Sequence, residues 1–271
     1  MRPRQIPAAP ALRLSYDMFA RGSRMVIIML IDKYWEHIDD LYGRVRSSQK
    51  ENMIAAGKLI AGAVGGGACV HIHDTGHIID AELINRGGGL VLYKKLKYSL
   101  VVDNPVRKRD RSHMDASMEG LAAYALKASG ACPGDVLIIG TVSGRTQSAV
   151  DLAFEAKKLG LKLILITSMT YATTVDPVHS SGKKLYEIAD VVLDNCAPAA
   201  EAMMEVEGLE ARLCAASGLS AAFIMWSITA VVVEELLARG IMPGVLKSAN
   251  FPGGNDYNKG FVEPRYEREG V

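Results

Sequence analysis

The feature that most constrains this fold is the alternation of short apolar runs with helix-like patterns through the middle of the chain. The runs have strand length and lie at 69–73, 90–93, 135–139, 161–167 and 190–193. Helical patterns lie mainly between them, at 112–128 and 147–159. The run from Val136 to Ile139 is apolar at successive positions, as in a strand covered by helices on both faces. The sequence therefore predicts a doubly wound α/β fold with a parallel sheet, without linker or internal repeat.

Two amphipathic helices are predicted before the first strand. Apolar residues recur every three or four positions from Ile27 to Leu41. A second stripe runs from Met53 to Ile60 and ends at three successive glycines, 65–67.

The first 24 residues differ in composition from the rest. They contain five arginines and three prolines but a single acid, Asp17. We interpret residues 1–24 as a disordered extension or as the product of a start codon assigned too early, and residues 25–271 as a single domain. An export signal is less favoured, because the apolar run 25–31 is short and lacks a small-residue cleavage site.

Composition disfavours several classes of function. The 31 basic and 30 acidic residues give a net charge of +1, so the chain as a whole has no attraction to nucleic acid or to an anionic membrane. The four cysteines form no C-x-x-C pair, which argues against a disulfide framework or a cysteine zinc site and favours the cytoplasm. The longest apolar run, 221–233, is too short to span a membrane.

The segment after the third predicted strand is the richest candidate site. Parallel α/β sheets bind ligands at the carboxyl ends of their strands, and here Gly140 is followed by Thr141, Val142, Ser143, Gly144, Arg145 and Thr146 before a helix begins. Hydroxyls, backbone N–H groups and a helix N-terminus suit a phosphate, and Arg145 can add charge-assisted hydrogen bonds. The alternative is an ordinary Ser/Thr helix cap without ligand. Neither a Walker loop nor a G-x-G-x-x-G turn is present.

This segment resembles the phosphate-binding half of the sugar isomerase (SIS) domain. The likeness includes residues 134–146, 156–160 and 163–168, and continues through 179–186, 189–195 and 248–254, where the chain is similar to an uncharacterised phosphosugar isomerase subgroup. The resemblance implies a flavodoxin-like, three-layer αβα sandwich around a five-stranded parallel sheet, with the N-terminal helices packed on the domain. It also implies that Thr141, Ser143 and Thr146 hold a sugar phosphate, and that the protein is a homodimer or homotetramer.

The end of the first strand departs from that family. A glycine-rich turn is usual there, whereas this chain has His71, His73, Asp74, Thr75, Gly76 and His77. Gly76 preserves the tight turn, and Thr75, Gly76 and His77 are predicted to contact the substrate. The same group contains metal-ligand residue types, but its spacing does not match a binuclear hydrolase, and no metal or other cofactor is predicted.

Aldose–ketose isomerisation needs a base that moves a proton between C1 and C2 of the open-chain sugar, and an acid that helps to open the ring. Glu82 lies in an alanine-glutamate-leucine setting that resembles the catalytic glutamate of phosphoheptose isomerases, and it is the predicted base. Its alternative interpretation is a solvated glutamate in the first turn of a helix. His179 is the predicted acid, and a plain surface histidine is the alternative.

Two further segments are interpreted as structural. The basic cluster 107–111 is typical of a solvated flank, with closure over a phosphate of an adjoining subunit as the alternative. The helix 218–237 is apolar nearly all round, which indicates a core or a dimer interface.

Three functions remain open on the sequence: a phosphosugar isomerase, a non-catalytic sensor of sugar phosphates, and a lyase similar to the N-acetylmuramic acid 6-phosphate etherases. The isomerase is the favoured prediction. A DNA-binding segment is not apparent before the domain, which weakens the regulator interpretation.

Overall fold

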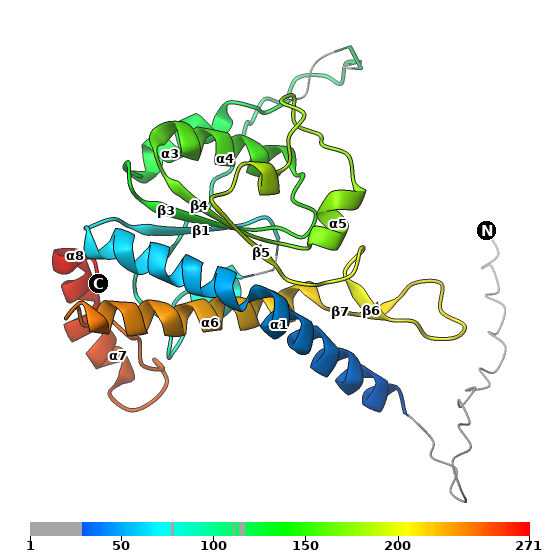
Figure 1. Cartoon of the computed structure of the whole chain (residues 1–271). Helices are drawn as coiled ribbons and strands as arrows, with labels where there is room; N and C mark the ends of the chain where they lie inside the picture. Colours follow the sequence, from blue (N-terminus) through cyan, green and yellow to red (C-terminus); the bar gives the residue numbers. More distant parts are fainter. Residues whose placement is uncertain (1–28, 77–78, 111, 114–116) are drawn as a thin grey trace, which may run out of the picture.

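A computed structural model describes residues 29–76, 79–110, 112–113 and 117–271 (Figure 1). The predicted extension 1–24 and His77 lie outside the described residues.

The described chain contains a five-stranded parallel sheet in the order β2-β1-β3-β4-β5. The strands are β1 (Val70–Asp74), β2 (Tyr93–Lys95), β3 (Val136–Gly140), β4 (Lys162–Thr167) and β5 (Val191–Asp194). The register places Val70 opposite Val136, and Val136 opposite Lys162. The predicted fold class is confirmed, and four of the five strands lie within about a residue of their predicted ranges.

Strand β2 is the exception, because the predicted run 90–93 forms a strand only from Tyr93 onward. Leu90 instead pairs with Val245 in an isolated antiparallel bridge. Leu90 and Leu92 are both 1% exposed. Val91 packs on Leu246 and Val262 of the C-terminal segment, whereas Leu90 and Leu92 belong to the core cluster that includes α1 and α6.

Helices cover both faces of the sheet and make three layers (Figure 1). On one face lie α1 (Leu30–Gly65) and α6 (Ser217–Ala238), which pack on Ile72, Ile138 and Ile164. On the other face lie α3 (Leu121–Ser129) and α4 (Gln147–Leu159), which pack on the alternate strand residues such as Leu137 and Leu163. The alternation of side chains along each strand divides the core in two.

The prediction of two separate N-terminal helices is wrong, because α1 is continuous over 36 residues. The polar stretch 46–52 interrupts the apolar stripe but contains no proline, so nothing ends the helix. Gln49 within it is buried, and its side-chain Oε1 accepts a hydrogen bond of 3.1 Å from Asp194 N.

Helix α3 begins nine residues later than the predicted 112. Gly120 has φ 94°, a left-handed conformation that stops the helix from extending backward. The carboxylate of Asp151 accepts hydrogen bonds from Gly120 N and Ala122 N, and so fixes this start from the neighbouring helix α4.

Helix α6 is long and apolar enough, by length and composition, to cross a membrane, and it is the one such helix among the described residues. It lies alongside α1, where a side chain at Gly57 would come within 2.5 Å of Val231. Ile224, Ile228 and Val232 of α6 are fully buried. The helix therefore forms part of the core, as the sequence predicts.

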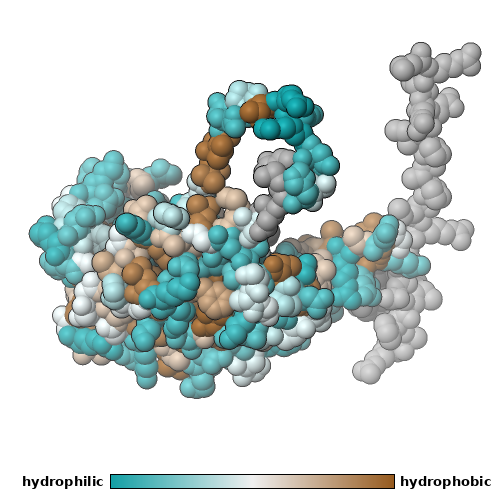
Figure 2. Space-filling model, turned by 90° about the horizontal axis from the view of Figure 1, so that it is seen from above, coloured by the Kyte–Doolittle hydropathy of each residue, from teal (hydrophilic) through white to brown (hydrophobic). Residues whose placement is uncertain are grey.

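The remaining elements are short. They are α2 (Asp80–Leu83), α5 (Met169–Thr174), the 3-10 turn η1 (Leu185–Glu187), the hairpin β6 (Ala202–Met204) with β7 (Leu213–Ala215), and the C-terminal α7 (Gly254–Tyr257), the π-helical turn η2 (Asn258–Val262) and α8 (Glu263–Glu269). Between β2 and α3, the exposed segment 99–110 contains neither helix nor strand, and an arch stands off the surface there (Figure 2).

Candidate functional site

The candidate site lies where the chain direction across the sheet reverses. Strand β1 lies between β2 and β3 in the sheet. The carboxyl ends of β1 and β3 therefore form the topological switch point. Thr75, just after β1, donates from its backbone N to Gly140 O at 3.1 Å and from its hydroxyl at 3.3 Å. These bonds join the turn after β1 to the loop after β3.

The loop between β3 and α4 has the local geometry of an anion cradle. Gly144 adopts φ 64°, which turns the chain sharply before the helix. Thr146 is the N-cap of α4, and its side chain makes no capping hydrogen bond within the described chain. The ordinary Ser/Thr cap considered from the sequence is therefore not formed. The first N–H groups of an α-helix lack intrahelical partners, so α4 presents donors and a positive dipole end here.

One cavity collects residues that follow four successive strands of the sheet. It has a volume of about 210 Å³ and is lined by Thr75, Gly76, Thr141, Val142, Ser143, Thr146, Tyr171 and Glu201. Five of the predicted substrate-binding residues are thus brought together: Thr75, Gly76, Thr141, Ser143 and Thr146. Among these lining residues Glu201 is the one charged group.

Two predicted loop residues lie outside this cavity lining. The guanidinium of Arg145 donates to Asp176 O at 3.2 Å, so it is directed to the segment after α5. Gly144 contributes its backbone conformation, and its carbonyl accepts from Leu185 N at 2.9 Å.

Sequence reasoning missed Tyr171 and Glu201. Tyr171 lies on α5 after β4, and Glu201 lies seven residues beyond the end of β5. Neither belongs to a recognisable motif. The only signal for them is the general rule that carboxyl ends of parallel strands meet at one edge of the sheet.

The possible metal ligands at the first strand are each engaged separately. His71 Nε2 lies 2.9 Å from Asp135 Oδ2, and His73 Nδ1 lies 3.0 Å from Leu96 O. Asp74 accepts from the backbone N of Gly76 at 2.9 Å, of Ile79 at 2.5 Å and of Asp80 at 3.2 Å, which organises the turn into α2. Among the described residues no group of three ligand-type side chains could hold a metal ion.

His73 is also electrostatically disfavoured as a cation. Burial lowers the pKa of its imidazole, and the hydrogen bond to Leu96 and the charges of Asp74 and Asp80 oppose that shift only in part.

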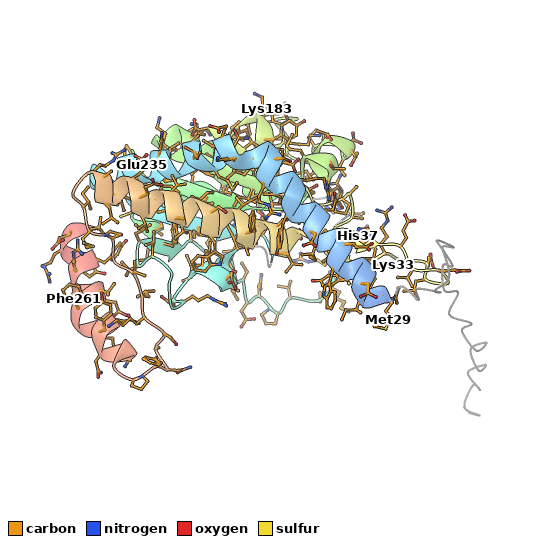
Figure 3. All side chains as sticks on the ribbon, turned by 60° about the horizontal axis from the view of Figure 1, so that its bottom comes forward. Met29, Lys33, His37, Lys183, Glu235 and Phe261 are labelled. Carbon is orange, nitrogen blue, oxygen red and sulfur yellow. The ribbon has the colours of Figure 1, made fainter. Side chains whose placement is uncertain are left out.

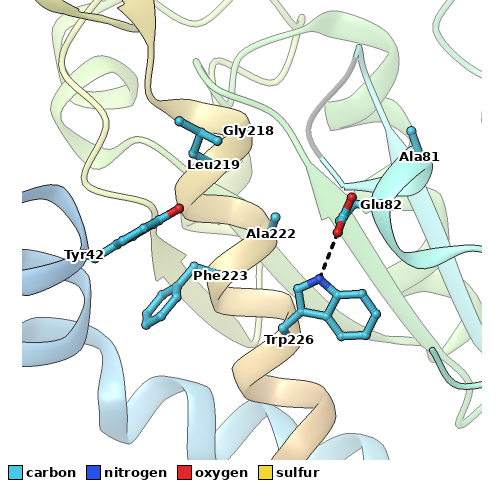
Figure 4. A pocket seen from close by; sticks show the side chains of 8 residues that line it. All are labelled: Tyr42, Ala81, Glu82, Gly218, Leu219, Ala222, Phe223 and Trp226. Carbon is cyan, nitrogen blue, oxygen red and sulfur yellow. Dashed lines mark hydrogen bonds between the residues drawn. The ribbon is translucent and has the colours of Figure 1, made fainter. Parts of the chain in front are cut away.

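Glu82 lines a neighbouring cavity of about 590 Å³ (Figure 4). That cavity lies between α1, α2 and α6, with Tyr42, Leu219, Phe223 and Trp226 among its walls. Glu82 Oε1 accepts from Trp226 Nε1 at 3.2 Å, and Oε2 accepts from Arg86 at 2.7 Å. Both carboxylate oxygens are therefore engaged, which differs from a simply solvated glutamate.

His179 lies against helix α4. Its Nδ1 is 2.9 Å from Ser181 Oγ, and its ring stacks obliquely on Phe154 with 5.4 Å between centroids. Its Nε2 is buried without a hydrogen-bond partner and lies 3.7 Å from Glu119 Oε2. His179 does not line the cavity of the Thr141–Thr146 loop in this chain, and its role as an acid stays a prediction.

Comparison with known proteins identifies the family to which the chain belongs. A model of the SIS domain matches residues 33–168. The chain belongs to the SIS domain family. Similar proteins include the UPF0309 protein of Streptomyces griseus, 33% identical over 84% of this chain and 92% of that protein, and the UPF0309 protein lmo0025 of Listeria monocytogenes, 32% identical over 83% of this chain and 92% of that protein. A solved phosphoheptose isomerase from Francisella tularensis aligns with TM-score 0.49 and 15% identity, covering 76% of this chain and 97% of that one.

Proposed function

We propose that this SIS protein binds a sugar phosphate at the Thr141–Thr146 loop and interconverts its aldose and ketose forms. One observation carries the proposal: four residues with hydroxyl side chains, Thr75, Thr141, Ser143 and Thr146, line a single cavity at the β1/β3 switch point. The N-terminus of α4 adds backbone donors and a favourable dipole for a phosphate dianion. The sugar then extends from the phosphate toward the other side chains of the cavity.

The arrangement suits isomerisation because the phosphate serves as a fixed handle. An anchored phosphate holds the flexible open-chain sugar in one orientation, so that C1 and C2 meet the same protein groups in every turnover. Moving a proton between these carbons needs one positioned base, which contributes about 10²–10⁴ in rate. The chemistry needs no redox cofactor, since one carbon is oxidised as its neighbour is reduced.

One observation favours the sensor as a second candidate function. Neither Glu82 nor His179, the predicted catalytic pair, lines the cavity that contains the loop hydroxyls. A sensor would bind the same ligand without turnover.

Binding and turnover are tested separately. A panel of aldose and ketose phosphates is screened by thermal shift, since a ligand that binds only the folded state raises the unfolding temperature. Each compound that stabilises the protein is then followed by NMR in D₂O for exchange of the C2 proton. Exchange of the C2 proton in at least one bound compound supports the isomerase. Binding with no exchange in all of the bound compounds supports the sensor.

A variant tests the location of the phosphate. Replacing Ser143 and Thr146 together by alanine removes two hydrogen bonds to a charged group, which should weaken sugar-phosphate binding by about 2–3 kcal/mol, roughly 30- to 150-fold in Kd. Titration calorimetry measures the loss. An exposed serine outside the site, Ser112→Ala, is the control. Unchanged affinity in the double variant would place the phosphate elsewhere.

A further inference from the structure

Glu201 reaches the cavity through an uncommon backbone turn. Ala200 and Glu201 have φ 62° and 72°, two successive non-glycine residues in the left-handed region. The turn is fixed by hydrogen bonds from Glu201 N to Pro198 O at 3.0 Å, from Ala202 N to Ala200 O at 2.9 Å and from Ala216 N to Glu201 O at 3.0 Å. Left-handed conformations are costly for residues with a Cβ, and they persist where the surrounding structure imposes them.

The carboxylate of Glu201 is held from the start of α6. Ser217, which is fully buried, donates from Oγ to Glu201 Oε2 at 3.3 Å. Glu201 itself is half-buried and lines the cavity together with Thr141, Ser143 and Thr146. The side chain is thus positioned toward the site by both its backbone and a fixed hydroxyl.

A carboxylate is an unfavourable neighbour for a phosphate dianion, because like charges in one small cavity repel each other. Binding of phosphate alone would be better served by a neutral or basic residue at position 201. The acid therefore acts on a part of the ligand other than the phosphate, and the part that needs a carboxylate is the pair of carbons that exchange a proton.

We infer that Glu201 is the catalytic base of the proposed isomerisation, an assignment that rests on the proposed function and differs from the sequence prediction of Glu82. Glu201 removes the proton from C2 of the open-chain aldose. The C2–H electron pair forms the C1=C2 bond, the π pair of the C1=O bond moves to O1, and O1 takes a proton from water, which leaves hydroxide. The enediol then loses its O2 proton to that hydroxide, the C2=O bond forms as the C1=C2 pair moves to C1, and C1 takes a proton from the Glu201 carboxyl, which exchanges its proton with solvent in the meantime.

Glu201→Gln is the direct test, because the amide keeps the size and the contact to Ser217 but cannot accept the proton. We expect C2 exchange in D₂O to fall at least 100-fold, while the sugar phosphate that stabilises wild type still raises the unfolding temperature. The exposed Glu207→Gln, in the adjoining hairpin, is the matched control and should exchange like wild type. Glu82→Gln should keep exchange within tenfold of wild type.

Glu201→Gly separates catalysis from stability. Glycine adopts positive φ without strain, which offsets the loss of the hydrogen bond from Ser217, so the unfolding temperature should stay close to that of wild type while exchange is lost. Exchange within threefold of wild type in Glu201→Gln would overturn the inference, and its loss in Glu82→Gln would then assign the base to Glu82. Failure of the proposed function itself is seen in wild type, as binding without exchange.

Discussion

At the scale of single residues, Gly144 sets the conformation of the loop between β3 and α4. Its φ of 64° is a conformation that side chains rarely adopt, and an added Cβ would lie 3.3 Å from Thr167 Oγ1. Thr167 cannot move away easily, because it is fully buried and donates to Val142 O at 2.9 Å. Backbone conformation and packing thus both require glycine here.

We expect Gly144→Ala to lower the free energy of unfolding by about 1–2 kcal/mol, from the left-handed strain and the close contact. Urea unfolding at neutral pH measures this change. Gly76→Ala is the matched control in the same cavity, because a Cβ there would meet nothing within 4 Å and its φ lies outside the left-handed region. Equal stability of the two variants would contradict the role given to Gly144.

At the scale of elements, the start of α4 is tied to two loops through Glu119. Its Oε1 accepts from Gln147 Nε2 at 2.7 Å and from Ser180 N at 3.0 Å, and its other oxygen accepts from the Ser180 hydroxyl. The hydrogen bonds from Ser180 are the largest cause that lowers the pKa of Glu119 to about 2. The helix that carries the proposed anion site is therefore held by a carboxylate that accepts hydrogen bonds only while it is ionised.

The lowered pKa makes this brace sensitive to acid. Because the pKa of Glu119 is lower in the folded chain than its usual value of 4.5, its contribution to stability is complete above about pH 4.5 and is lost as the pH falls toward 2. Urea unfolding between pH 2 and 5 should show a smaller decline for Glu119→Gln than for wild type. In Ser180→Ala the decline in the free energy of unfolding should be smaller than in wild type, since the variant lacks the hydroxyl that contributes most to lowering the pKa of Glu119. Identical pH profiles for all three proteins would refute this account.

At the scale of the whole molecule, the start of α1 projects from the body of the protein (Figure 3). Met29 and Trp35 are each 57% exposed, and Ile31 is 47% exposed. Exposed apolar clusters of this kind mark surfaces for protein contacts. The cavity lined by Tyr42, Phe223 and Trp226 lies between a later part of α1 and α6.

We expect the protein to be a homodimer or homotetramer whose contact includes this end of α1. Sedimentation velocity should give a multiple of the 29.2 kDa chain mass. Trp35→Glu should shift the equilibrium toward monomer, because a charge would be buried in the contact. Glu36 is the neighbouring residue and is also exposed, and Glu36→Gln should leave the assembly intact. A monomer in the wild type at micromolar concentration would contradict the expectation.

The sequence by itself determined the class of fold and singled out the loop that we propose as the anion site. Both depend on local signals: the period of apolar residues in strands and helices, and a glycine and hydroxyls between a strand and a helix. The sequence analysis misplaced the start of α3, because that start is set by the contact between Gly120 and the Asp151 carboxylate of the neighbouring helix. It also divided α1 in two, although no helix-breaking residue interrupts the helix.

Only the tertiary structure decided which side chains share the cavity. Thr75, Ser143 and Glu201 are far apart in the chain and meet because β1, β3 and β5 end at one edge of a parallel sheet. Glu82 is close to Thr75 in sequence, yet the turn organised by Asp74 leads it into the cavity beside α6. Side-chain convergence of this kind depends on the register and twist of the sheet, which no local pattern of residues specifies.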